Sequence, residues 1–276
     1  MIGTVVVLYN PTSEEIINLQ TYLEYSDYLV IVNNSEVSYV NDIKSALGFS
    51  NKYHIIDNCS NLGLCRALNQ GIAYLSSINF DWVVVFDADS RITNNIFKLY
   101  RKILHSIDNV DNIALLAPQH SYLRRNVKLY HGLKRIDWAM TSGCLFNIKV
   151  FNICGGFYEP LFVDGLDVDY CLYAKEKKYD IFECGEIVIK HNPAINVEKT
   201  ICGLKLNYGI ASPYRYYLQS RSLIWVILRY KNFWALKMFF IKFFKVIFLF
   251  PNKKSYLSSY LKGFVDGLKL YINKTR

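Results

Sequence analysis

The chain has 276 residues, 52% of them hydrophobic and 16% aromatic, and its 32 basic and 23 acidic side chains give a net charge of +9. This composition excludes an intrinsically disordered protein and allows one large α/β domain with an appended segment. The seven cysteines show no C-x-x-C pair and no metal-ligand spacing, which predicts reduced thiols. No basic region precedes an apolar stretch at the N-terminus, so we expect no signal peptide and a cytoplasmic location.

The positive charge is concentrated near the C-terminus. Residues 221–276 contain twelve Lys and Arg against one acid, Asp266, whereas residues 1–220 carry a net charge of −2. We therefore expect two regions: a near-neutral α/β domain in residues 1–213, and a basic, aromatic-rich helical extension in residues 214–276.

Strand and helix signals alternate through the first ninety residues. Expected strands cover residues 4–9, 28–32, 53–56 and 81–86, and expected helices begin near residue 13 and cover residues 62–75. This order predicts a Rossmann-like, mainly parallel central sheet that is flanked by helices and has its polar loops at one edge. The first strand is not followed by G-x-G-x-x-G or a Walker A sequence, which disfavours dinucleotide-binding and P-loop proteins.

Two acids, Asp87 and Asp89, directly follow the fourth expected strand. In open α/β sheets, ligands bind at the carboxyl ends of strands. Asp-x-Asp places two hard oxygen ligands on one side of a short turn, which suits a divalent cation that carries a diphosphate. The alternative is a solvated turn in which an Asp caps the following helix.

Residues 233–250 are mostly large and apolar but contain Lys237, Lys242 and Lys245. A membrane-spanning helix needs about 20 apolar residues with few charges, so these lysines argue against a span. On a helix, Lys231, Lys242 and Lys245 would form a basic stripe beside a Phe-rich face, which predicts a helix in the interface of an anionic membrane. The alternative is a helix buried against the protein or another subunit. Nucleic-acid binding is not expected, because no recognised nucleic-acid fold precedes the segment.

The order of the polar motifs resembles family 2 glycosyltransferases with a GT-A fold, and among them bacterial rhamnosyltransferase-like enzymes of surface polysaccharide synthesis. The resemblance covers roughly residues 3–192. The motifs that carry it are Val6-Val7-Leu8-Tyr9-Asn10-Pro11, Val32-Asn33-Asn34-Ser35, Asn61-Leu62-Gly63, Asn69-Gln70-Gly71, Phe86-Asp87-Ala88-Asp89-Ser90, Ser142-Gly143, Gly155-Gly156-Phe157-Tyr158-Glu159, and Phe162-Val163-Asp164 followed by Asp167-Val168-Asp169-Tyr170-Cys171-Leu172.

The resemblance implies a site for a nucleotide-diphosphate sugar. The residues expected to bind this donor are Tyr9, Asn10, Pro11, Asn33, Asn34, Arg66, Asp87, Ala88 and Asp89. It also implies a divalent metal, Mn²⁺ or Mg²⁺, held by Asp87, Asp89 and His191, that neutralises the leaving diphosphate. Relatives usually have, at Asn33, an Asp that accepts from the pyrimidine ring; the Asn33 amide oxygen could still accept, and an ordinary Asx turn is equally expected. A structural His191 and a solvated Arg66 are the corresponding alternatives.

The resemblance further implies inverting transfer, with Asp167 as the general base beside the acceptor hydroxyl. Asp164, Asp169, Ser142 and Gly143 are expected to contact the acceptor, and capping of the following helix is the alternative for the two acids. Arg215, Tyr217 and Arg221 could contact an acceptor diphosphate.

The implied reaction moves a sugar, plausibly rhamnose from dTDP-rhamnose, to a lipid-linked saccharide in O-antigen or capsule synthesis. It would occur at the inner face of the cell membrane, with residues 222–276 on the anionic lipid surface. A GT-A-like nucleotidyltransferase is an alternative, although such enzymes usually have a Gly-rich basic loop after the first strand. A phosphohydrolase of the haloacid dehalogenase type is another, although its Asp-x-Asp normally ends the first strand.

Overall fold

The computed structural model describes residues 1–92, 95–121, 130–190, 196–201 and 204–274. The chain forms two compact units: unit 1 consists of Met1–Glu159 and Asp167–His191, and unit 2 consists of Pro160–Leu166 and Asn192–Arg276. The boundary expected at residue 213 falls inside unit 2, and a separate domain in residues 214–276 stays a prediction.

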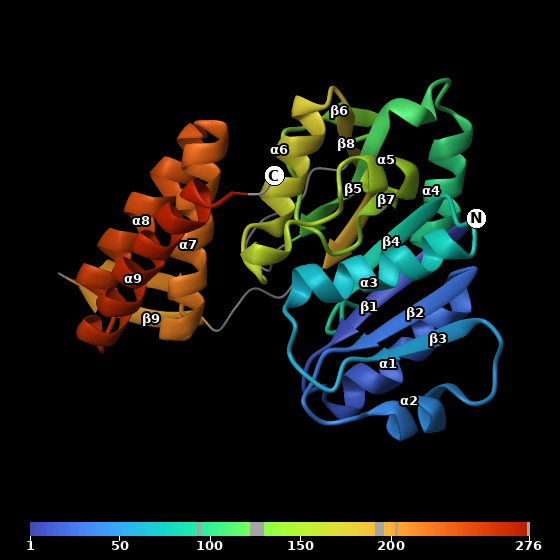
Figure 1. The fold of residues 1–276 in the computed structure, drawn as a ribbon, viewed down its shortest axis with the longest axis horizontal. Coiled ribbons are helices and arrows are strands. Elements are labelled where there is room, and N and C mark those ends of the chain that lie inside the picture. Colours follow the sequence, from blue (N-terminus) through green and yellow to red (C-terminus); the bar gives the residue numbers. More distant parts are fainter. Residues whose placement is uncertain (93–94, 122–129, 191–195, 202–203, 275–276) are drawn as a thin grey trace. The chain divides into compact units, whose positions relative to one another are not determined.

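Unit 1 is built on an eight-stranded sheet with the order β3-β2-β1-β4-β7-β5-β8-β6 (Figure 1). Strands β3, β2, β1 and β4 are parallel, β7 runs antiparallel to β4 and β5, and β8 is parallel to β5 but antiparallel to β6. The mainly parallel central sheet predicted from the sequence is confirmed. The strands are β1 (Ile2–Leu8), β2 (Tyr28–Asn33), β3 (Tyr53–Asp57), β4 (Trp82–Asp87), β5 (Ile113–Ser121), β6 (Leu133–Arg135), β7 (Leu145–Asn147) and β8 (Asp180–Lys190).

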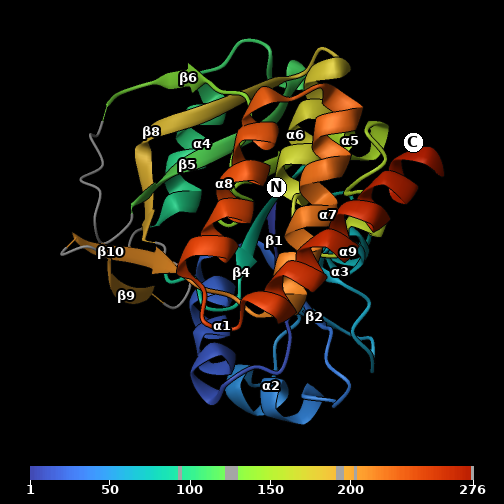
Figure 2. The same ribbon diagram turned by 90° about the vertical axis from the view of Figure 1, so that its left-hand side faces the viewer.

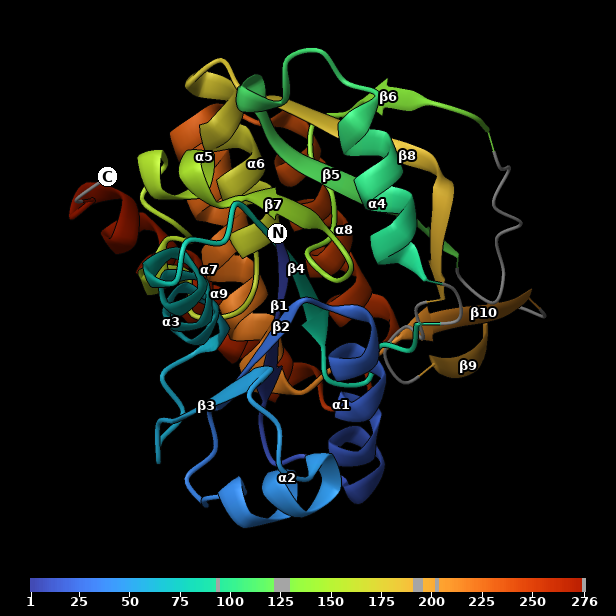
Figure 3. The ribbon, with the colours of Figure 1, turned by 90° about the vertical axis from the view of Figure 1, so that its right-hand side faces the viewer.

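Helices cover both faces of the sheet, because alternate strand residues point to opposite sides. On one face, sheet residues such as Val6 and Phe86 form a core with α1 (Ser13–Tyr25), α2 (Val40–Leu47) and α4 (Ile96–His105). On the other face lies α3 (Leu64–Ser77) (Figure 3). A Cβ atom at Gly71 of this helix would lie 2.5 Å from a methyl group of Val5. Two further helices, α5 (Ile148–Ile153) and α6 (Leu166–Glu176), follow β7 along the chain.

Unit 2 contains a hairpin of β9 (Asn196–Ile201) and β10 (Leu204–Gly209), and three helices, α7 (Pro213–Tyr230), α8 (Phe233–Leu249) and α9 (Lys253–Ile272) (Figure 2). The Ser212 side chain caps α7, and Pro213 occupies its first turn. The contact of α9 with α7 depends on small residues: a Cβ at Gly263 would lie 2.2 Å from the carbonyl oxygen of Tyr217. Because only glycine fits there, the two helices approach closely.

Helix α8 differs from the expectation for its lysines. The ammonium group of Lys242 donates to Gln219 at 2.8 Å, and that of Lys245 donates to the carbonyl of Gly209. The exposed stripe instead carries Phe240, Phe244 and Phe248, which are 49%, 50% and 63% exposed. The predicted basic stripe is therefore wrong for two of its three lysines, because their long stems fold over aromatic rings inside unit 2. Among the described helices, none is long and apolar enough to cross a membrane.

Candidate functional site

Polar side chains gather where the parallel strands of unit 1 end. In the strand register, Val7 is paired with Asp87, Leu8 with Asn33, and Asn33 with Asp57. The carboxyl ends of β1, β2, β3 and β4 therefore share one edge of the sheet. This edge is where ligands bind in open α/β sheets.

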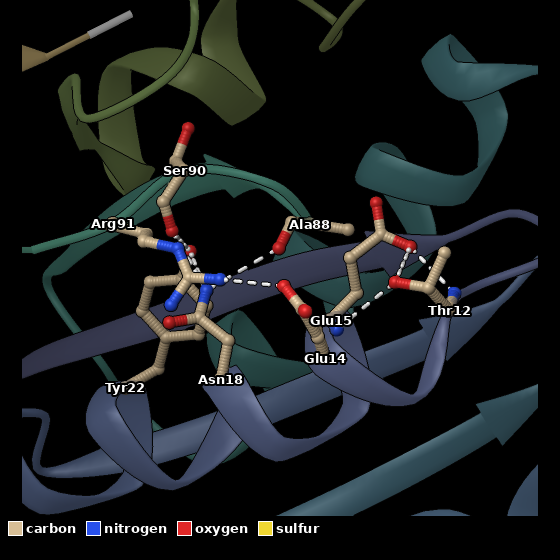
Figure 4. A network of polar contacts seen from close by, with 8 residues as sticks. All are labelled: Thr12, Glu14, Glu15, Asn18, Tyr22, Ala88, Ser90 and Arg91. Carbon is tan, nitrogen blue, oxygen red and sulfur yellow. Dashed lines mark hydrogen bonds and ion pairs between the residues drawn. The ribbon is translucent and has the colours of Figure 1, made fainter. Parts of the chain in front are cut away.

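Helix α1 fixes the loop that contains Asp87 and Asp89. The side-chain amide of Asn18 donates to the carbonyl oxygens of Ala88 and Ser90, at 3.3 and 2.7 Å, and the buried Tyr22 hydroxyl donates to the same Ser90 carbonyl (Figure 4). Burial raises the pKa of Tyr22 well above its ordinary value, so the hydroxyl keeps its proton and remains a donor. The loop is thus held through its backbone, and the side chain of Asp89 is exposed.

The segment before β7 supports the same loop from another side. The Ser142 hydroxyl accepts from the backbone N–H of Asp87 at 3.1 Å and lies 2.7 Å from the Ser90 hydroxyl. Gly143 has a φ of +78°, and a Cβ there would lie 1.9 Å from a methyl group of Ile189. Ser142 and Gly143 are both buried, and within unit 1 they support the loop that contains Asp87 and Asp89. The contact with the acceptor that is expected of them stays a prediction.

Asp167 and Asp87 both act on the pKa of one buried thiol. The pKa of Cys144 is raised well above its ordinary value, first by burial and then by nearby acidic groups that include Asp167 and Asp87. Two carboxylates from distant parts of the chain, the start of α6 and the end of β4, are therefore brought into one region of unit 1. Asp169, also in the first turn of α6, is fully buried, so any part it takes in acceptor binding would be indirect.

The amide groups after β2 are used inside the protein. The fully buried Asn33 donates to the carbonyl of Val37 at 2.9 Å and to the carboxylate of Asp57 at 2.8 Å. Its side-chain oxygen Oδ1 accepts from the backbone N–H of Ser35 at 3.4 Å, which is the Asx turn considered as the alternative. Direct recognition of a base by Asn33 would require this buried side chain to leave its partners.

Asn34 links two loops rather than facing solvent. Its side-chain oxygen accepts from the backbone N–H of Leu62 and from Asn58, both at 3.1 Å, and its amide donates to Asn61 at 3.2 Å. These bonds join the end of β2 to the loop before α3. The buried Asn34 therefore fixes the backbone at the edge of the sheet where the nucleotide sugar is expected to bind.

The other expected donor residues are more accessible. Tyr9 is 52% exposed, and the following Asn10 has a φ of +47° and donates its backbone N–H to the Ser35 hydroxyl at 2.8 Å. Arg66 is exposed in the first turn of α3, while Pro11 is buried and helps the chain enter α1. An exposed aromatic ring and an exposed guanidinium group are therefore available on unit 1.

The fit of a metal ion depends on Asp87 and Asp89. Among the residues that the structure describes, no three His, Cys, Asp or Glu side chains gather as a metal site, and His191 lies outside the described residues. A magnesium-like ion that arrives with a diphosphate commonly takes only one or two protein carboxylates, the rest of its shell being phosphate oxygens and water. Asp87 and Asp89 meet that smaller requirement.

Asp164 lies in unit 2, where it forms an ion pair with Arg215 at 2.9 Å. Burial raises the pKa of Asp164, although Arg215 and Lys242 act in the opposite direction. Arg221 donates to the carbonyl oxygens of Pro160 and Leu161, at 2.8 and 2.9 Å. Both arginines therefore have partners within unit 2, and their contact with an acceptor stays a prediction.

Some residues that shape the site were not expected from the sequence. Asn18 and Tyr22 donate hydrogen bonds to a loop about seventy residues further along the chain, and nothing in the neighbouring sequence indicates these bonds. In the sequence, Cys144 resembles an ordinary core residue. Asp57 does carry a signal in the sequence: it is an acid at the end of a short strand, the same kind of position as that of Asp87. This comparison makes the end of β3 part of the candidate site.

The fold and the acidic edge define a GT-A, glycosyltransferase-like protein. No protein-family model matches the chain. In sequence it is similar to the dTDP-rhamnosyl transferase RfbF of Shigella flexneri, 28% identical over 239 residues that cover 80% of this chain and 78% of the relative. The predicted resemblance to rhamnosyltransferase-like, family 2 enzymes is thereby confirmed.

Solved structures show the same fold. A crystal structure of GalNAc-T7 with UDP, GalNAc and Mn²⁺ matches with a TM-score of 0.57 at 11% identity, over 100% of this chain and 56% of that one. S. aureus TarS 1–349 in complex with UDP matches with a TM-score of 0.56 at 13% identity, over 82% of this chain and 65% of that one. The chain thus spans less than two thirds of either structure. The GT-A fold predicted from the sequence is confirmed.

Proposed function

We propose that this protein is an inverting glycosyltransferase that moves rhamnose from dTDP-rhamnose to a lipid-linked saccharide acceptor in the synthesis of a bacterial surface polysaccharide. The observation that carries the proposal is the polar edge of unit 1 where β1, β2, β3 and β4 end, with Asp87 at the end of β4. Asp167 belongs to the same unit, and burial together with both acids raises the pKa of Cys144. The similarity to a dTDP-rhamnosyl transferase supports the choice of donor.

The donor would lie along the carboxyl edge of β1–β4. Its diphosphate would face the exposed Asp89 and the neighbouring Asp87, which would hold Mn²⁺ or Mg²⁺, and the ion supplies positive charge against the leaving phosphate. Because Asn18, Tyr22 and Ser142 fix the loop backbone, the two carboxylates need little rearrangement when the donor binds.

Asp167 would act as the general base. In the transfer step, the acceptor oxygen forms a bond to the anomeric carbon while the bond from that carbon to the diphosphate oxygen breaks. The proton of the acceptor hydroxyl passes to the carboxylate of Asp167, and the electron pair of the broken bond leaves with the nucleotide diphosphate. Attack opposite to the leaving group inverts the anomeric centre.

The aromatic stripe of α8, Phe240, Phe244 and Phe248, supports a membrane-bound acceptor. Large exposed apolar surfaces usually mark an interaction site. Basic residues flank the stripe: Lys231 and Lys237 are exposed, as are Lys253 and Lys254 beyond the end of the helix. Aromatic side chains with nearby lysines suit the interface of an anionic bilayer, where the lipid-linked acceptor would also be found.

The decisive experiment is transfer from a panel of nucleotide sugars, with Mn²⁺ or Mg²⁺, to a lipid-linked saccharide, with the Asp167→Asn variant beside the wild type. We expect turnover with dTDP-rhamnose, no turnover by the variant, and unchanged binding of dTDP to both. Asp108→Asn, an exposed acid of unit 1, is the matched control. In a parallel reaction with a nucleoside triphosphate and a sugar phosphate, release of inorganic pyrophosphate would instead indicate a nucleotidyltransferase. Turnover by Asp167→Asn would remove Asp167 from the base role.

A further inference from the structure

Asp57 lies at the carboxyl edge of β1–β4, where the nucleotide sugar would bind. The proposed reaction gives this acid no role. It ends β3, is partly exposed, and accepts hydrogen bonds from the Asn33 amide at 2.8 Å and from the Ser38 hydroxyl. Burial alone would raise the pKa of Asp57, but donors from Ser38, Asn33 and Cys59 outweigh it and lower the pKa. Asp57 is therefore a carboxylate at neutral pH.

One of the hydrogen bonds that Asp57 accepts can be exchanged for a hydrogen bond from a ligand. An ionised carboxylate can accept about four hydrogen bonds. Two come from Asn33 and Ser38, and the others come from the backbone and the thiol of Cys59. The thiol is exposed and is a weak donor, so a stronger ring N–H could take its place.

The position of Asp57 relative to the Asp87–Asp89 loop matches the two ends of a nucleotide. The strand order places β2 and β1 between β3 and β4, so Asp57 and Asp87 are three inter-strand steps apart, about 14 Å. An extended nucleoside diphosphate is of comparable length. With its diphosphate at Asp87 and Asp89, its base would reach the end of β3.

The two intervening strands offer apolar surface for a flat ring. Tyr9, directly after β1, is 52% exposed, and Val37, in the loop after β2, is 60% exposed. Bases are commonly read by stacking on aromatic or apolar side chains combined with hydrogen bonds to their polar edge. The carboxylate at the end of β3 and the exposed ring after β1, two strands away, supply one of each.

We propose that Asp57 determines the base specificity of the donor, because its carboxylate accepts the N3–H of thymine or uracil and Asn33 holds that carboxylate in place. The inference rests on the proposed function and adds the residue that selects the nucleotide. Cytosine has an unprotonated N3 and would place an acceptor against the carboxylate. The site should therefore select uracil and thymine nucleotides over cytosine nucleotides.

The test is the binding of dTDP, UDP and CDP, each with Mn²⁺, to the wild-type chain of 276 residues and to its Asp57→Asn variant, measured by titration calorimetry. We expect the wild type to prefer dTDP and UDP over CDP. In Asp57→Asn, affinity for dTDP and UDP should fall about tenfold or more, the scale of one hydrogen bond to a charged group, while affinity for CDP should stay the same or improve. An equal loss for all three nucleotides, or no loss, would overturn the inference.

A double variant, Asn33→Asp with Asp57→Asn, separates base reading from folding. It keeps an amide–carboxylate pair between β2 and β3 but moves the charge to the fully buried position 33. We expect its thermal stability to exceed that of Asp57→Asn while the preference for dTDP and UDP stays lost. A loss confined to UDP and CDP would point instead to the ribose 2′-hydroxyl.

The same data distinguish failure of the inference from failure of the proposed function. If the wild type binds none of the three nucleotides, the glycosyltransferase proposal and the inference both fall. If it binds them without regard to the base, only the role of Asp57 falls.

Discussion

The hydroxyl of Ser142 and the backbone N–H of Asp87 form a hydrogen bond of 3.1 Å, which ties the turn before β7 to the first acid of the Asp-x-Asp loop. The same hydroxyl lies 2.7 Å from that of Ser90. A small polar residue far along the chain therefore sets the backbone from which both carboxylates project.

Ser142→Ala should weaken this loop. Removing one partner of a buried hydrogen bond costs about 1–3 kcal/mol, so we expect a lower melting temperature and weaker Mn²⁺-dependent binding of dTDP. Ser77→Ala, at an exposed position of α3, is the matched control and should change neither quantity. Unchanged binding in Ser142→Ala would mean that the loop is held well enough by α1 alone.

Asp89→Ala should reduce the effect of metal on nucleotide binding. Because the exposed Asp89 is half of the proposed carboxylate pair, dTDP affinity measured with Mn²⁺ should fall toward the value measured with EDTA. Asp111→Ala, which removes another exposed acid of unit 1, is the control. If the variant keeps the full gain from Mn²⁺, the ion is held elsewhere.

Phe240→Ser with Phe244→Ser should release the protein from lipid. Each ring is about half exposed, so its insertion would add about 1 kcal/mol, and the double variant should bind anionic liposomes about 30-fold more weakly. Phe49→Ser, which removes a fully exposed ring of unit 1, is the control for non-specific hydrophobic binding to the liposomes. Equal flotation of all three proteins with liposomes would exclude α8 as the membrane contact.

Lys245→Met should stabilise the protein more at pH 7 than at pH 9.5. Burial lowers the pKa of Lys245 to about 8, below the ordinary value of 10.5, so between these values the unfolded chain holds a proton that the folded chain releases. The contribution of Lys245 to the free energy of unfolding therefore rises with pH through that window. The cost of burying the protonated lysine, which the Met substitution removes, is greatest below pH 8.

Urea unfolding at the two pH values measures this difference, with Lys237→Met on the exposed side of α8 as control. The lost hydrogen bond to Gly209 acts at both pH values, so the change between them is the informative quantity. If the stability gain of Lys245→Met instead increased with pH, burial would not lower the pKa of Lys245.

Several parts of the site could be predicted because their signals are local. Asp87 and Asp89 follow an apolar run that can only be a buried strand, and parallel strands necessarily gather such ends at one edge. The placement of Asp87 and Asp89 needed only the period of the hydrophobic pattern and the direction of the strands. The role of Asp167, in the first turn of α6, followed only from the resemblance to family 2 glycosyltransferases and stays a prediction.

Other parts could not be predicted, because they depend on contacts between distant segments. Nothing near Asn18 indicates that its amide will hold the Ser90 carbonyl, and helical periodicity alone placed Lys242 and Lys245 on the wrong side of α8. Long lysine stems can fold over neighbouring rings, so the position of the Cα atom does not decide where the charge lies. The burial of Asn33 likewise depends on β3, which the motif after β2 does not reveal.

The short segment Pro160–Leu166 belongs to unit 2 although the chain on both sides of it belongs to unit 1. A chimera that replaced only residues 192–276 with those of a relative would separate Asp164 from Arg215 and the Pro160 carbonyl from Arg221. Recombination between such enzymes would have to exchange residues 160–166 and 192–276 together to keep these contacts.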